Sequence, residues 1–92
     1  TPQNRIMELF LTGRSLDFST EDVIEETGLA KTTTLKVMNE LLGKRYVLAT
    51  RMWKGVQLYG LNKENKDVKL FLKAYDAILH TIAEEYSEKV VA

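Results

Sequence analysis

The chain has 92 residues and no cysteine, and its thirteen basic residues balance thirteen acidic ones. This length suits one small domain, the missing cysteines exclude disulfides and thiolate metal sites, and no apolar run approaches the ~20 residues of a membrane span. No stretch has the pattern of a secretory signal, so we expect a soluble, cytoplasmic protein.

The charges are unevenly distributed along the chain. Residues 31–54 contain six basic residues and one acidic residue, whereas residues 1–30 carry a net charge of −4 and residues 55–92 a net charge of −1. A net charge of zero therefore does not exclude a nucleic-acid partner, because one stretch carries the positive charge.

The first thirty residues predict two helices and a short strand. Thr1 can cap a helix that has Pro2 at its first position and ends near Gly13. Residues 15–18 alternate polar and apolar side chains, which is typical of a short strand. The sequence "STED" from Ser19 is a capping-box pattern that predicts a helix over residues 20–27, ended by Gly28.

A third helix is predicted after a three-residue turn, over residues 31–43, and the pair suggests a helix-turn-helix. A hairpin follows, with strands at 46–51 and 56–61 joined by "MWKG", in which Gly55 can take a positive φ. Asn62 and Asn65 provide turn and cap chemistry. Residues 66–90 lack glycine and proline, and they predict one long helix. The expected fold class is α+β, mostly α.

The helix over residues 31–43 has an apolar side and a polar side. Its inward positions include Thr34, whose methyl can pack in the core while its hydroxyl bonds to the preceding turn. Its outward face holds Thr32, Thr33, Lys36 and Asn39. These residue types contact bases and phosphates when a helix lies in the major groove of DNA. The alternative is an ordinary solvated helix surface.

The order of helix, short strand, "EDVIEETGLAKTTTLKVMNELL" and hairpin resembles the winged helix-turn-helix domains of bacterial and archaeal transcription regulators, over residues 4–61. Such families often carry G-hydrophobic-S-x-S-T-V where this chain has "GLAKTTT", residues 28–34. Ala30 replaces the usual capping serine, so we expect the helix start to shift toward Thr32 as the cap. Arg45 stands where many families have a glycine before the hairpin.

The resemblance implies that helix 31–43 enters the major groove, while the hairpin tip, residues 51–55, contacts the backbone or minor groove. We call this tip the wing. It would place Arg51, Trp53 and Lys54 near DNA, and the cations, with Lys31, would neutralise phosphates. For Trp53 the alternative is an indole that packs on its own hairpin.

The long helix carries a heptad seam that continues from Val68 at spacings of four and three. The seam residues are Leu72, Tyr75, Leu79, Ile82 and Tyr86. A second apolar line runs beside it through Phe71, Ala74 and Ile78, which is more than so small a body can bury. We therefore predict a DNA-binding domain at 1–61 and a dimerisation helix at 62–92; the alternative is a helix that wraps along its own domain. A homodimer would suit a palindromic site.

Catalytic and metal chemistry is not indicated. His80 is the only histidine, and its neighbours Asp76 and Glu84 suggest a charged stripe rather than a metal site. No phosphate loop or activated nucleophile is recognisable, so we expect no enzyme, no cofactor and no metal. The predicted function is sequence-specific binding of double-stranded DNA by a dimeric transcriptional regulator. The alternatives are a plasmid-partition or architectural DNA-coating protein, and a protein-interaction module that does not bind DNA.

Overall fold

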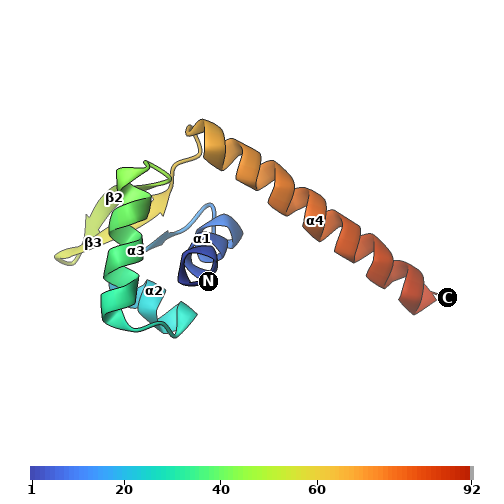
Figure 1. Cartoon of the computed structure of the whole chain (residues 1–92), viewed down its shortest axis with the longest axis horizontal. Helices are drawn as coiled ribbons and strands as arrows, with labels where there is room; N and C mark the ends of the chain where they lie inside the picture. The colour runs from blue at the N-terminus through green and yellow to red at the C-terminus, as the bar shows by residue number, and fades with distance from the viewer. Residues whose placement is uncertain (92) are drawn as a thin grey trace.

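The computed structural model describes residues 1–91, and the side chains of residues 1–86. Its elements in chain order are α1 (Pro2–Thr12), β1 (Asp17–Phe18), α2 (Thr20–Thr27), α3 (Lys31–Gly43), β2 (Val47–Trp53), β3 (Val56–Leu61) and α4 (Lys66–Val91). In Figure 1 the first three helices and the sheet form one body, from which α4 extends away toward the C-terminus. The predicted α+β class and its winged helix-turn-helix arrangement are confirmed.

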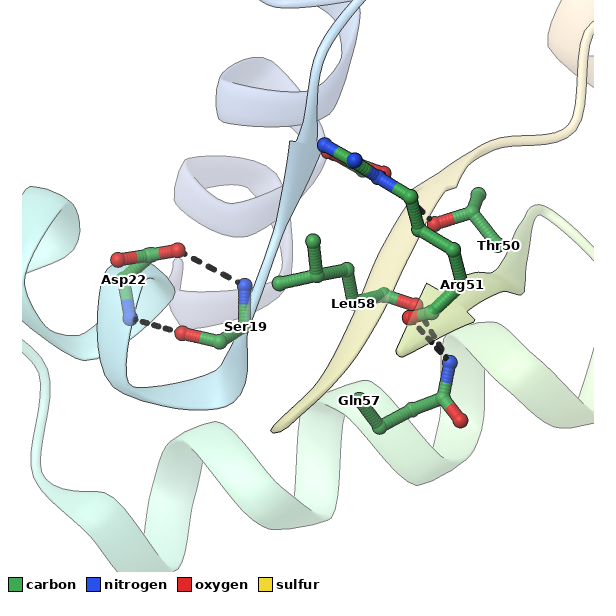
Figure 2. Close-up of polar contacts among 7 residues, drawn as sticks. Ser19, Asp22, Thr50, Arg51, Gln57 and Leu58 are labelled. Carbon is green, nitrogen blue, oxygen red and sulfur yellow. Dashed lines mark hydrogen bonds and ion pairs between the residues drawn. The ribbon is translucent and has the colours of Figure 1, made fainter. Parts of the chain in front are cut away.

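The predicted starts of the first two helices are confirmed by their hydrogen bonds. The Thr1 hydroxyl accepts from the Asn4 N–H at 3.2 Å, with Pro2 in the first turn of α1. At α2 the Ser19 hydroxyl accepts from the Asp22 N–H, and the Asp22 carboxylate accepts from the Ser19 N–H, both at 3.0 Å (Figure 2). These bonds satisfy N–H groups that the first turn of a helix leaves unpaired.

The start of α3 differs from the prediction, because Thr32 does not cap it. The cap position is Ala30, and no side chain accepts from the free N–H groups. Ala30 and Lys31 are exposed, so water can solvate these groups without a capping side chain. Thr34 behaves as predicted: it is completely buried, and its hydroxyl donates to the Ala30 carbonyl at 3.0 Å.

The sheet has the order β1-β3-β2, and all of its pairs are antiparallel. A β-bulge interrupts β2 at Thr50, so that Ala49 lies opposite Tyr59 and Arg51 lies opposite Leu58. The hairpin turn is tighter than predicted, because β2 continues to Trp53 instead of ending at Arg51. Two residues with positive φ, Lys54 at 48° and Gly55 at 79°, are enough to reverse the chain.

The core lies where the three N-terminal helices meet the inner side of the sheet and the first turns of α4. Ile6 and Phe10 of α1 are completely buried there, and the Phe10 ring meets the edge of Phe18 at 5.5 Å between centroids. The other buried apolar members come from α1 itself, from all the later helices and from β2 and β3: Leu11, Val23, Val37, Met38, Leu41, Val47, Leu61 and Val68. This packing fixes α3 against α1 and α2, with its other side outward.

The junction between α3 and β2 uses an arginine where glycine is common. The Tyr46 N–H donates to the Leu41 carbonyl at 3.0 Å and the Arg45 N–H to the Leu42 carbonyl at 3.1 Å, which is the Schellman pattern. Arg45 accordingly takes a left-handed φ of 59°. Its carbonyl accepts from the side-chain amide of Asn62 at 2.8 Å, and this bond holds the strained residue in place.

Only the first half of α4 is attached to the body. The Asn65 side chain caps it, as predicted, by accepting from the Val68 N–H at 3.2 Å, and Val68 is completely buried. Arg14 pairs with Asp76 at 2.6 Å, and the Tyr75 hydroxyl is hydrogen-bonded to Thr12. Beyond these contacts the helix projects from the body, which makes the molecule 52 Å long and 28 Å across (Figure 1). The described part of α4 therefore packs on its own domain as far as Asp76 and projects from it beyond that residue.

Candidate nucleic-acid interface

The outer face of α3 is polar and basic, as the helical angles predict. Lys31, Thr32, Lys36 and Asn39 are exposed, and Thr33 is half-buried at the side. Neither Lys31 nor Lys36 has an ion-pair partner among residues 1–86. Figure 1 shows α3 on the side of the body away from the end of α4. Thr32, Lys36 and Asn39 therefore share one exposed surface of α3, with Thr33 at its side and Lys31 exposed at the N-terminal end of the helix.

The single carboxylate of α3 is directed away from the centre of this face. Glu40 is half-buried and accepts a hydrogen bond from the Gln3 side chain of α1 at 2.7 Å. Its negative charge is thus held toward α1. The positive charge of Lys36 on the outer face is left without a neutralising neighbour on its own helix.

The wing arginine is already paired within the chain. The Arg51 guanidinium donates to the Asp17 carboxylate of β1 at 2.8 Å from Nε and 3.3 Å from Nη2. The Thr50 hydroxyl donates to the same carboxylate at 3.0 Å. The Arg51 hydrogen bond holds the pKa of Asp17 below its ordinary value, and the same bond raises the pKa of Arg51. The positive charge of Arg51 is thus already paired with the carboxylate of Asp17.

Trp53 lies between two cations at the end of β2. Its ring centroid is 5.6 Å from the guanidinium carbon of Arg51 and 5.6 Å from Nζ of Lys54, distances at which a cation is attracted to the ring. The indole nevertheless keeps 55% of its surface exposed. It therefore contacts the side chains of its own hairpin while still presenting a broad apolar surface to solvent.

Two residues that support the wing were not predicted as site residues. Asp17 reaches Arg51 from a strand 34 positions earlier, and Gln57 holds the wing together by donating from Nε2 to the carbonyls of Arg51 at 3.0 Å and Leu58 at 2.9 Å (Figure 2). No local pattern marks either residue. The contact of Asp17 depends on the strand order β1-β3-β2, which the sequence spacing alone does not reveal, whereas Gln57 acts within the hairpin itself.

The five predicted seam residues of α4 divide into two groups. Leu72 and Tyr75 are half-buried and pack against the core of their own chain. Leu79, Ile82 and Tyr86 lie beyond the body, with 48%, 55% and 69% of their surfaces exposed. The proximal seam thus has an intramolecular contact, and the distal seam remains available for a partner.

Metal binding and membrane spanning each require a recognisable arrangement of residues. Residues 1–86, whose side chains the structure describes, contain no group of three His, Cys, Asp or Glu side chains that could hold a metal ion. His80 lies 3.0 Å from Glu84, one turn along α4. None of the helices in this range is long and apolar enough to cross a membrane.

Comparison with solved structures supports the fold. MepR, a transcription regulator of the Staphylococcus aureus multidrug efflux pump MepA, superposes with a TM-score of 0.69 and 12% identity, over 97% of this chain and 64% of that one. The ferric uptake regulator of Francisella tularensis superposes with a TM-score of 0.61 and 20% sequence identity, over 71% of this chain and 53% of that one. The Hop2–Mnd1 complex of Giardia lamblia superposes with a TM-score of 0.59 and 21% sequence identity, over 96% of this chain and 56% of that one.

These likenesses establish a winged-helix fold and leave function to be argued from the site. No protein-family model and no curated protein matches the sequence. The chain spans between 53% and 64% of the lengths of the three solved chains described above. Two of the three names are those of regulators, and the third is that of a protein complex.

Proposed function

We propose that the chain is a sequence-specific double-stranded DNA-binding protein that acts as a homodimer and regulates transcription. The observation that carries this proposal is the outer face of α3, where exposed lysine, threonine and asparagine side chains lie on a helix fixed by its opposite side in the core. An α-helix of this kind fits the major groove of B-DNA. The structural likeness to MepR and to the ferric uptake regulator supports the regulatory role.

In the proposed complex the side chains divide into two tasks. Lys36 would pair with guanine and Asn39 with adenine, while Thr32 and Thr33 would contact a thymine methyl or a phosphate oxygen. The remaining cations would hold the protein on the backbone: Lys31, Arg51 and Lys54. Trp53 would lie against the sugar-phosphate backbone beside them. Phosphate contacts fix register, and base contacts give specificity.

The dimer of this proposal uses the distal part of α4. Leu79, Ile82 and Tyr86 would be covered by a second copy, and the two recognition helices would then meet a palindromic site. Light scattering at micromolar concentration is expected to report twice the chain mass of 10.5 kDa. A mass of one chain at that concentration contradicts the dimer.

The decisive experiment selects bound sequences from random duplex DNA and then titrates the selected site. Lys36→Ala is expected to weaken binding about tenfold or more on that site, because one good base contact contributes about 1–3 kcal/mol. Lys63→Ala is the matched control, since it removes one exposed lysine from the loop after β3 instead of from α3. Absence of duplex binding at low salt, or equal effects of the two substitutions, contradicts the DNA-binding proposal.

Two alternatives keep the same fold. A plasmid-partition or architectural protein would extend its footprint along DNA as its concentration rises, whereas a regulator protects one site. A protein-interaction module is favoured by one observation: the wing exposes apolar surface at Met52, Trp53 and Val56. That module would bind no duplex in the titration above.

A further inference from the structure

An apolar groove opens between α1 and the proximal half of α4. It has a volume of about 480 Å³ and is lined mainly by Met7 and Leu11 of α1 and by Phe71, Ala74 and Ile78 of α4. Glu8 and Asn4 add the few polar atoms. Apolar surface of this kind is unfavourable in water, so a partner that covers it gains free energy.

The distal half of α4 carries apolar side chains that are exposed to solvent. Beyond Ile78 the helix has no part of the described body beside it, and Leu79, Ile82 and Tyr86 form an exposed apolar ridge. A shallow second hollow, lined by Ala77, Ile78, Thr81 and Ile82, continues from the groove along the same side of the helix. Ile78 belongs to both hollows, so the groove and the ridge meet at this residue.

We propose that the groove between α1 and α4 is filled by the distal α4 ridge of a second copy, with the two α4 helices antiparallel about a twofold axis near Ile78. This inference rests on the homodimer of the proposed function and specifies its geometry. A twofold axis makes the contact reciprocal, so each ridge lies in the other copy's groove. In a parallel pair, groove would face groove and ridge would face ridge, which leaves both grooves unfilled.

The charges along α4 favour the same orientation. Residues 66–75 contain three lysines and one aspartate, whereas residues 76–86 contain neither lysine nor arginine and three carboxylates, of which Asp76 is paired with Arg14. An antiparallel pair brings the basic half of one helix beside the acidic half of the other. A parallel pair would place like charges side by side at an interaxial distance of about 8–10 Å, which is unfavourable.

The absence of cysteine from the chain allows a direct test by cross-linking. We would place single cysteines at Ala74, in the groove, and at Glu85, which lines the second hollow beside the ridge, in the full chain. In the antiparallel pair two copies of position 85 lie about 21 Å apart along the helices, because the rise is about 1.5 Å per residue. Position 74 of one copy lies within about one turn of position 85 of the other.

The experiment mixes tagged Ala74→Cys with untagged Glu85→Cys and adds a short bismaleimide cross-linker. We expect a mixed dimer band, and little or no dimer band from Glu85→Cys alone. Strong cross-linking of Glu85→Cys with itself shows a parallel pair and overturns the proposal while leaving the dimer intact. Glu21→Cys, on exposed α2, measures random collisions.

Light scattering on the same samples separates the remaining outcomes. If the protein has the mass of a dimer but gives no mixed band, the antiparallel arrangement is overturned. If it has the mass of a monomer, both the antiparallel arrangement and the dimer are overturned. Duplex binding by the cysteine variants is measured in parallel, so that loss of DNA binding is recognised as a failure of the proposed function and not of the helix geometry.

Discussion

Asp17 and Arg51 form a two-point ion pair that joins β1 to the wing, with Nε of Arg51 2.8 Å from Oδ2 of Asp17. The partner of the wing arginine in the free protein is therefore a carboxylate, in the position where a phosphate would lie in the proposed DNA complex. Binding to DNA would exchange one anion for another, which reduces the net gain from this contact.

Removing that competition is expected to strengthen DNA binding. Asp17→Asn eliminates a negative charge beside the wing and frees Arg51, so duplex affinity should rise several-fold at low salt and the salt slope should steepen by about one unit. Asp76→Asn is the matched control, because it frees Arg14 beside α4, away from the wing. Fluorescence anisotropy over a salt series measures both quantities. Weaker binding by Asp17→Asn would instead show that the carboxylate positions Arg51 for DNA.

Stability is expected to fall in acid through the two arginine-paired aspartates. Hydrogen bonds from Arg51 and Arg14 lower the pKa values of Asp17 and Asp76 from the ordinary value of 3.8. Because the folded pKa lies below the unfolded one, each pair stabilises the fold fully above pH 3.8 and loses this contribution as the pH falls through the lowered value. Urea midpoints of the double variant Asp17→Asn/Asp76→Asn should therefore change less between pH 5 and pH 2. An equal change of the urea midpoint with pH in the variant and in the parent would contradict this expectation.

Two glycines provide a paired test of backbone conformation. A Cβ added at Gly43 or at Gly55 would meet no atom within 4 Å, but Gly55 has a φ of +79° whereas Gly43 lies in α3. Gly43→Ala is expected to raise the free energy of unfolding by about 0.5–1 kcal/mol, and Gly55→Ala to lower it by about 1 kcal/mol. Chemical denaturation measures both. If the two substitutions change the free energy of unfolding in the same direction, the backbone φ is not what determines their effects.

The threonine run that opens α3 separates core from interface. Thr34→Val should leave DNA affinity unchanged and alter stability by less than about 1 kcal/mol, because the Ala30 carbonyl still accepts from the backbone N–H of residue 34 at 3.0 Å. Thr32→Val should leave stability unchanged and weaken DNA binding several-fold, because Thr32 is exposed on the outer face. Thermal melts and titrations of both variants test this division, and a loss of affinity in Thr34→Val alone would refute it.

Local chemistry in the sequence was sufficient for most helix boundaries. Thr1 with Pro2, the Ser19–Asp22 capping box and Gly28 with a φ of 69° each act within one turn of the chain, so their effects depend little on the rest of the fold. The outward side of α3 could also be predicted, since helical periodicity places Thr34 inward once the apolar residues are assigned to the core.

Features that depend on distant contacts were missed. The Asp17–Arg51 pair requires β3 to lie between β1 and β2, and the sequence spacing does not specify this strand order. Arg45 has no local signal for a left-handed conformation, which its carbonyl bond to Asn62 helps to hold. The predicted cap at Thr32 was wrong because the helix already begins at Lys31, which places Thr32 inside the first turn. The sequence did not show that Leu72 and Tyr75 pack on their own domain, because the same heptad pattern is expected for a helix that packs on its own domain and for one that packs on a partner.

The extra residue in β2 decides which side of the wing is charged. Without the bulge at Thr50, the regular alternation of a strand would place Arg51 opposite Gln57 instead of Leu58. Arg51 and Trp53 would then lie on the reverse side of the hairpin, and Met52 would lie on the side that now faces Asp17. A wing of identical composition would present its cations in the opposite direction. The number of residues between Ala49 and the turn is therefore as much a part of the proposed DNA-binding surface as the residues themselves.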